Sequence, residues 1–200
     1  MVNKQRLKII GLSGTNGSGK DAIGTILADQ FGYFFISVTD ALREEAVRRG
    51  WTAERKYTSI VSTDWRREFG LAVLVERALQ KYQQAGGDQK YKGVVMASLR
   101  NPFEADKVHE LGGVVIWVDA DPEVRYSRTV KNVALRGNRG DESASFEHFL
   151  ADEAAEMRAT SNDDNGLNMS AVKQKADLTL LNNSDSLNEL TRTIKDTLHL

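Results

Sequence analysis

The sequence predicts a three-layer α/β fold, in which helices cover both faces of a five-stranded parallel sheet. Short apolar runs alternate along the chain with segments whose apolar residues recur at helical spacing. Polar or glycine-containing stretches follow the apolar runs, and in parallel sheets that is where ligands bind. The length of 200 residues fits a single domain that spans the whole chain.

The expected strands are continuous apolar runs, as is typical of strands buried on both faces. They span residues 7–13, 33–38, 92–98, 112–120 and 176–182. Helices are expected over 21–31, 39–50 and 62–87, and a last one carries Leu187, Leu190, Ile194 and Leu198. The polar stretch 159–170 reads as a loop.

The overall composition excludes several classes of function. A net charge of -1 gives no reason to expect broad binding to nucleic acid or to an acidic membrane. The absence of cysteine excludes disulfides and thiolate metal sites. The apolar runs are much shorter than the ~20 residues of a membrane span. We therefore expect a cytoplasmic protein that binds neither nucleic acid nor a membrane, and the oligomeric state stays open.

The stretch "GTNGSGKD", residues 14–21, lies between the first strand and the first helix. Its glycines allow successive N–H groups to point at a phosphate, at the positive end of the following helix. Lys20 adds a mobile positive charge. This position favours a nucleotide site over an ordinary glycine-rich turn. The candidates for nucleotide binding are Gly14, Thr15, Asn16, Gly17, Ser18, Gly19, Lys20, Asp21 and Ala22.

Asp21 stands where this loop pattern usually has a hydroxyl group, and the neighbouring Ala22 has none either. A carboxylate in the first helical turn is favoured by the helix dipole without any further role. A carboxylate beside bound phosphates is also a ligand for Mg²⁺. The sequence leaves both interpretations open.

The stretch "ISVTDALREE" follows the second strand and contains Ser37, Asp40 and Arg43. Asp40, or Thr39 before it, is expected to cap the helix. Asp40 is also a candidate general base and a candidate metal ligand, and one carboxylate can serve more than one of these roles. Arg43 is interpreted as a contact for a substrate phosphate, with a solvated helix arginine as the alternative.

The stretch "SLRNPFEAD" follows the third strand, so Arg100 faces the same edge of the sheet. Its guanidinium is expected to bind a phosphate in bidentate fashion. Glu104 either holds Arg100 or begins the next helix. Arg66 and Arg67 in the long helix are further candidates for substrate contact.

Four arginines follow the fourth strand within a short stretch: Arg125, Arg128, Arg136 and Arg139. A segment bearing arginines can close over a phosphoryl group and neutralise its charge. The alternative is a solvated run of charges. Because the net charge is only -1, the clustering favours a small lid over about residues 129–145.

These stretches together resemble the nucleoside monophosphate kinase-like branch of the P-loop kinases. The similarity runs from Leu7 to about Leu190 and is greatest to archaeal dephospho-CoA-kinase-like and nucleotide-kinase-like proteins and to phage deoxynucleoside monophosphate kinases. The resemblance implies that Arg43 and Arg100 contact the acceptor and that Asn182 borders the adenine. Aspartate after the loop lysine is also a feature of such relatives, although they often carry threonine where this chain has Ala22.

The resemblance implies transfer of the γ-phosphoryl group of ATP, with Mg²⁺, to a small phosphate-bearing acceptor, most readily a (deoxy)nucleoside monophosphate. Dephospho-CoA is the alternative acceptor, and a nucleotide-binding regulator with little kinase activity is the alternative function. The expected catalytic residues are Lys20, Asp40, Arg128, Arg136 and Arg139. The expected substrate contacts are Ser37, Asp40, Arg43, Arg66 and Arg100, and the expected metal ligands are Asp21 and Asp40.

Overall fold

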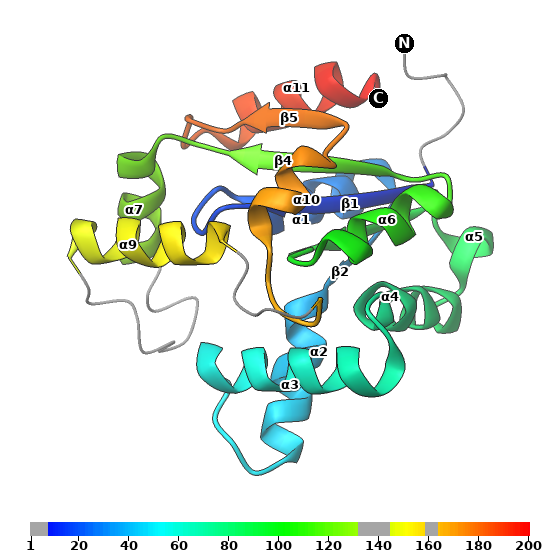
Figure 1. Cartoon of the computed structure of the whole chain (residues 1–200). Coiled ribbons are helices and arrows are strands. Elements are labelled where there is room, and N and C mark those ends of the chain that lie inside the picture. The colour runs from blue at the N-terminus through cyan, green and yellow to red at the C-terminus, as the bar shows by residue number, and fades with distance from the viewer. Residues whose placement is uncertain (1–7, 132–144, 159–163) are drawn as a thin grey trace.

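The computed structural model describes residues 8–131, 145–158 and 164–200 of the chain. Within these ranges the strands form one five-stranded parallel sheet in the order β2-β3-β1-β4-β5. The strands are β1 Ile9–Gly14, β2 Phe34–Ser37, β3 Val94–Ala97, β4 Val114–Asp119 and β5 Leu178–Leu181. Helices lie on both faces of the sheet (Figure 1), which confirms the predicted α/β class.

Strand β1 lies at the centre of the sheet, between β3 and β4. Its Ile10 lies opposite Val95 of β3. Because successive side chains of a strand point to opposite faces, Ile10 and Leu12 pack in one core while Gly11 between them faces the other. A Cβ at Gly11 would lie only 2.6 Å from the Cδ1 of Leu99, so this position leaves no room for a side chain.

Each face of the sheet has its own hydrophobic core. On one face, residues of α1 (Lys20–Phe31) and α11 (Leu187–Leu198) pack together, with Ile23, Leu27 and Ile194 fully buried. On the other face lie α2 Val38–Arg48, α3 Arg55–Phe69, α4 Val73–Gln84, α6 Pro102–Glu110 and α10 Met169–Gln174. The short helix α5, Gly87–Lys90, precedes β3.

Two helices lie beyond the end of the sheet toward which β4 points (Figure 1). Helix α7, Pro122–Lys131, follows β4, and α9, Phe146–Met157, packs beside it. The contact contains an aromatic cluster, with the ring of Tyr126 5.3 Å from that of Phe146 and 5.6 Å from that of Phe149. The predicted lid over 129–145, with Arg136 and Arg139, falls almost entirely outside the described residues.

The expectation of one helix over 62–87 is wrong. The segment holds the end of α3, the whole of α4 and a break between them at Gly70, which has φ 101° and ψ 160°. Only glycine adopts that conformation at low cost, so Gly70 ends α3. The apolar spacing continues across the break because both helices face the same core, where Val75 and Tyr82 are buried.

The expected loop over 159–170 is also partly wrong. Met169 and Ser170 already belong to α10, because the side chain of Asn168 accepts a hydrogen bond from the N–H of Ala171, at 3.1 Å, and so caps the helix. Met169 is 3% exposed, so the first residue of this helix is packed in the interior of the protein. Among the described helices, none is long and apolar enough to span a membrane.

Candidate functional site

A cavity of about 780 Å³ opens where the strands end. Its walls come from the loop after β1, from α2 and α3, from the segment after β3, and from α7 and α9. Among the residues proposed from sequence, those that line it are Asn16, Gly17, Gly19, Lys20, Asp21, Ala22, Ser37, Arg43, Arg66 and Arg100. The structure therefore brings the expected donor side and acceptor side of the site into one space.

The glycines of the loop after β1 have conformations that other residues rarely adopt. Gly14, Gly17 and Gly19 have φ values of 140°, 79° and 95°. Gly17 also touches α7, because a Cβ there would lie 2.5 Å from the carbonyl oxygen of Arg125. Gly19 caps α1, so the loop leads directly into the positive end of that helix.

The ammonium group of Lys20 folds back over this loop. Its Nζ donates to the carbonyl oxygens of Gly14, at 2.8 Å, and Thr15, at 2.7 Å, and lies 3.4 Å from the Oγ of Ser18. The side chain also lines the cavity. One positive charge is thus held over the concave face of the loop, which suits a bound anion.

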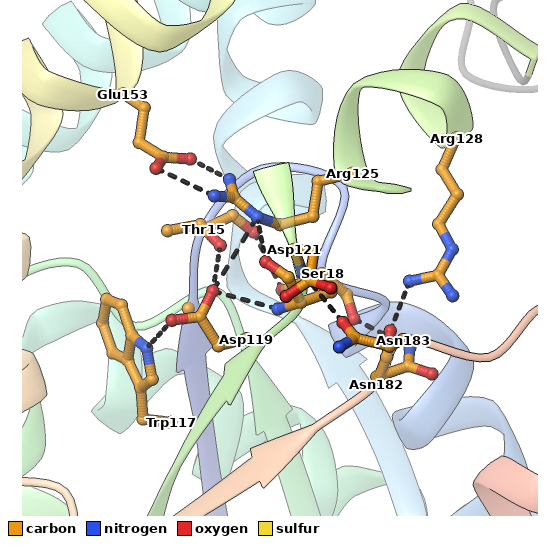
Figure 2. A network of polar contacts seen from close by, with 12 residues as sticks. Thr15, Ser18, Trp117, Asp119, Asp121, Arg125, Arg128, Glu153, Asn182 and Asn183 are labelled. Atoms are coloured by element: carbon orange, nitrogen blue, oxygen red, sulfur yellow. Dashed lines mark hydrogen bonds and ion pairs between the residues drawn. The ribbon is translucent and has the colours of Figure 1, made fainter. Parts of the chain in front are cut away.

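Asp119, the last residue of β4, fixes the loop from below (Figure 2). Its Oδ1 accepts hydrogen bonds from the hydroxyl of Thr15, at 3.2 Å, and from the N–H of Ala120, at 3.0 Å, and its Oδ2 accepts from Nε1 of Trp117, at 3.2 Å. The sequence analysis did not single out this carboxylate. Its position directly after a buried strand was the available signal.

Arg125 of α7 is buried, in contrast to the solvated alternative considered for this run of charges. Its Nε donates to the carbonyl oxygen of Ala120, at 2.7 Å, and both Nη atoms contact the carboxylate of Glu153 on α9 (Figure 2). Burial lowers the pKa of Arg125, while the nearby Asp119 raises it. Arg125 therefore connects α9 to the region around the glycine-rich loop that follows β1.

Arg128 lies one turn further along α7 and is not among the residues that line the cavity. Its guanidinium donates to the carbonyl oxygen of Asn182, at 2.8 Å (Figure 2). It also donates to the carbonyl oxygen of Ser184, at 2.7 Å, and its Nε donates to Asp185, at 3.1 Å. Asn182 in turn donates from Nδ2 to the carbonyl oxygen of Ser18, at 2.9 Å. Arg128 thus orders the loop after β5, which packs against the loop after β1.

Helix α2, which follows β2, begins with a different cap from the one expected. Ser37 is the N-cap residue of α2, and no side chain makes the capping hydrogen bond, so capping by Thr39 or Asp40 is wrong. Asp40 instead accepts a 2.6 Å hydrogen bond from Nη1 of Arg43. Arg43 lines the cavity, whereas the side chain of Asp40 is 58% exposed.

Arg66 and Glu104 form a buried ion pair that supports the segment after β3. The Nη2 of Arg66 lies 2.7 Å from Oε1 of Glu104. The other carboxylate oxygen of Glu104 accepts from the N–H groups of Arg100, at 2.8 Å, and Asn101, at 3.2 Å. Glu104 lies in the first turn of α6, where it forms a capping box with Asn101, and it also holds the backbone of Arg100. Its side-chain partner is Arg66, not the guanidinium of Arg100.

Sequence reasoning missed five charged residues that line the cavity: Arg55, Lys56, Asp152, Glu153 and Glu156. Glu156 pairs with Nη2 of Arg55 and lies 3.2 Å from Nη1 of Arg100. The spacing of Phe149, Glu153 and Glu156 along one helical face was a usable signal. Within residues 8–131, 145–158 and 164–200, no group of three or more His, Asp and Glu side chains could hold a metal ion.

Comparison with known proteins identifies one matching family model and several related sequences. A family model described as an AAA domain matches residues 10–147. A UPF0200 protein of Pyrococcus abyssi is 31% identical over 156 residues, which cover 74% of this chain and 78% of that protein. A cytidylate kinase of Archaeoglobus fulgidus is 28% identical over 122 residues, which cover 61% of this chain and 60% of that enzyme.

Solved structures share the fold at low sequence identity. A shikimate kinase from Acinetobacter baumannii in complex with shikimate has a TM-score of 0.57 and is 17% identical. The match covers 96% of this chain and 93% of that one. At this identity the likeness concerns the fold alone.

Proposed function

The chain belongs to the AAA domain family and to the UPF0200 proteins, and from this membership we propose that it is an ATP-dependent kinase of small molecules. The acceptor that we propose carries a phosphate group, with a (deoxy)nucleoside monophosphate as the first choice. One observation carries the proposal: Lys20 and the two arginines Arg43 and Arg100 line the same cavity. That arrangement offers cations to a donor and to an acceptor phosphate together.

The donor side is the loop over residues 14–22, which leads into the positive end of α1. Its backbone N–H groups and Lys20 would bind the β- and γ-phosphates of ATP. Asn182, which bonds to the carbonyl of Ser18, would border the adenine together with the loop that Arg128 orders. Arg128 would therefore act on the donor side by positioning. Any direct contact with the transferred group would fall to Arg136 and Arg139.

Mg²⁺ fits the residues of the cavity through Asp21. Mg²⁺ in kinases keeps several waters and is bound by one or two carboxylates and by substrate phosphates. Asp21 lines the cavity next to Lys20, while Asp40 is not among the lining residues and is bound to Arg43. We propose Asp21 as the main carboxylate for the metal and Asp40 as the second candidate. When bound, Mg²⁺ would neutralise charge on the transferred phosphoryl group.

The acceptor side is formed by Arg43 and Arg100, with Ser37 at the end of β2 beside them. Arg66 lines the same cavity, and its buried pair with Glu104 assigns it to positioning Arg100. The role of Asp40 depends on the acceptor. A phosphate acceptor attacks through an oxygen that is already ionised and needs no base, whereas a hydroxyl acceptor would transfer its proton to Asp40.

The similarity to a cytidylate kinase favours CMP and dCMP as the first acceptors to test. The experiment measures ATP consumption with each common nucleoside monophosphate, with dephospho-CoA, and without acceptor. We expect stimulation by one nucleoside monophosphate, with its diphosphate as product, and loss of that stimulation in Lys20→Ala. ATP binding that no acceptor converts into turnover would contradict the proposal and would support a nucleotide-binding regulator.

A further inference from the structure

Two arginines at the wall of the cavity share one carboxylate of the protein itself. Glu156 of α9 lies with its Oε1 3.2 Å from Nη1 of Arg100, and the same oxygen pairs with Nη2 of Arg55. The three residues come from separate parts of the chain, and all of them line the cavity. Two guanidinium groups that converge on one anion are the typical arrangement for binding phosphate.

The two arginines are held on rigid parts of the fold. The backbone N–H of Arg100 donates to the buried carboxylate of Glu104, at 2.8 Å, and its carbonyl oxygen accepts from the N–H of Asn168, at 3.0 Å. Arg55 is the first residue of α3. Because their backbones are fixed, both side chains can still reach the position of the Glu156 carboxylate when Glu156 has moved away.

The helix that carries Glu156 is held much less firmly. None of the residues of α9 is buried. Its described contacts with the rest of the protein include the aromatic cluster at Tyr126 and the ion pairs of Glu153 and Glu156. Displacing the Glu156 side chain therefore exposes little apolar surface, so the hydrophobic cost of this movement is small.

Helix α9 also supplies most of the negative charge in the cavity. Among the described lining residues, six are basic and four are acidic, and three of the four acids belong to α9: Asp152, Glu153 and Glu156. Without those three carboxylates the cavity would be strongly positive and ready for an anionic ligand.

We propose that Arg55 and Arg100 form a binding site for a phosphate monoester and that Glu156 is its internal occupant. The phosphate displaces Glu156, which then turns away from the two arginines. The ligand is the acceptor phosphate, so this inference rests on the proposed function. It adds Arg55 to the acceptor side and makes Glu156 a determinant of acceptor affinity, because an internal occupant lowers apparent affinity by the fraction of molecules in which it is bound.

The test is the binding of inorganic phosphate, measured by calorimetry at constant ionic strength and without nucleotide. All proteins carry Lys20→Ala, so that the loop lysine does not contribute. We expect Glu156→Gln to bind phosphate about five- to tenfold more tightly than its parent, as an occupancy of about nine-tenths implies. The matched control is Glu147→Gln, which removes the same charge from α9 outside the cavity and should change affinity less than about twofold.

A second variant tests the arginine. Arg55→Met should weaken phosphate binding about tenfold in the Glu156→Gln protein, because it removes a charge-assisted hydrogen bond. Equal affinities for Glu156→Gln and Glu147→Gln, an unchanged affinity in Arg55→Met, or no phosphate binding to any of the proteins would overturn the inference. If Glu156→Gln does not fold, Glu156→Ala replaces it under the same criterion, since it also removes the carboxylate.

The inference about the phosphate site and the proposed kinase function can be contradicted independently of each other. If phosphate affinity responds as expected while no nucleoside monophosphate stimulates ATP consumption, the anion site stands and the proposed kinase function falls. If an acceptor is phosphorylated but neither phosphate affinity nor the KM for that acceptor changes in Glu156→Gln, the kinase stands and the role of Glu156 falls.

Discussion

The carboxylate of Glu104 lies 2.7 Å from the Nη2 atom of Arg66, and solvent reaches almost none of either side chain, with exposed fractions of 0% and 1%. The pair connects α3 to the start of α6 and thereby fixes the backbone of Arg100. The proposed acceptor side of the cavity thus depends on a buried charge pair that itself makes no proposed contact with the reacting atoms.

Arg66→Met should lower the free energy of unfolding by about 3–5 kcal/mol, because it leaves the buried carboxylate of Glu104 without its counter-charge. Urea denaturation measures the loss. The double variant Arg66→Met/Glu104→Gln should lose clearly less than the sum of the two single variants. Simple additivity of the two losses would show that the pair is not coupled.

Lys20→Ala should lower turnover at least about 100-fold while the protein stays folded, because the lysine supplies the positive charge of the loop. Steady-state assay with the responding acceptor gives turnover, and circular dichroism checks the fold. Lys90→Ala removes an exposed lysine from α5 as the control and should leave turnover unchanged. Comparable turnover in Lys20→Ala and Lys90→Ala would contradict the role of the loop.

Thr15→Val should raise the KM for ATP about tenfold with a smaller effect on kcat. The change removes the hydroxyl that donates to Asp119 and so loosens the loop, and hydrogen bonds to charged groups contribute about 1.5–3 kcal/mol. Thr25→Val makes the same replacement at an exposed position of α1. A KM that is equally unaffected in both variants would mean that Asp119 does not position the loop.

The carboxyl group of Glu45 in α2 should make the free energy of unfolding depend on pH. Hydrogen bonds from Arg48 and Arg49 lower the pKa of this carboxyl from 4.5 to about 2. Because the folded-state pKa is the lower one, the stabilisation is complete above pH 4.5 and is lost as the pH falls toward 2. After allowance for solvent screening at the exposed Arg48, the contribution is about 1–2 kcal/mol.

Urea denaturation of wild type and Glu45→Gln at several pH values between 7 and 3 measures this contribution. We expect the difference in free energy of unfolding between the two proteins to fall by about half or more over that range. A difference that stays constant with pH would show that the carboxylate of Glu45 is not held by these arginines in solution.

Gly70→Ala should lower the free energy of unfolding by about 1–3 kcal/mol, the usual cost of an unfavourable backbone conformation. A Cβ at Gly70 would meet no atom within 4 Å, so the loss isolates the conformational cost from any clash. Glu68→Ala is the control on the same exposed end of α3. Equal stability of the two variants would show that the break between α3 and α4 does not need glycine.

The predicted fold follows from local patterns, which is why the sheet and its strands were expected correctly. The true strands are shorter than the apolar runs; Lys92 and Ser98, for example, lie outside β3, which spans only Val94–Ala97. The break at Gly70 was missed because the apolar spacing continues through it, and spacing does not report φ and ψ.

The candidate site was predictable where a residue follows a strand directly. Lys20, Arg43 and Arg100 come together because the carboxyl ends of parallel strands meet at one edge. The contact between Arg55 and Glu156 depends on how α3 and α9 pack in three dimensions, which no local pattern reveals. The pairing of Arg66 with Glu104 likewise joins residues 38 positions apart.

The hydrogen bond from Asn182 to the carbonyl oxygen of Ser18 joins residues 164 positions apart. During synthesis the loop after β1 leaves the ribosome before β5, yet one of its supports arrives only when β5 and the turn after it have emerged. A nascent chain that ends before Asn182 carries the whole glycine-rich sequence without this support. The proposed binding site for phosphates therefore matures only after the turn that follows β5 has been made, well after its own glycine-rich sequence has emerged.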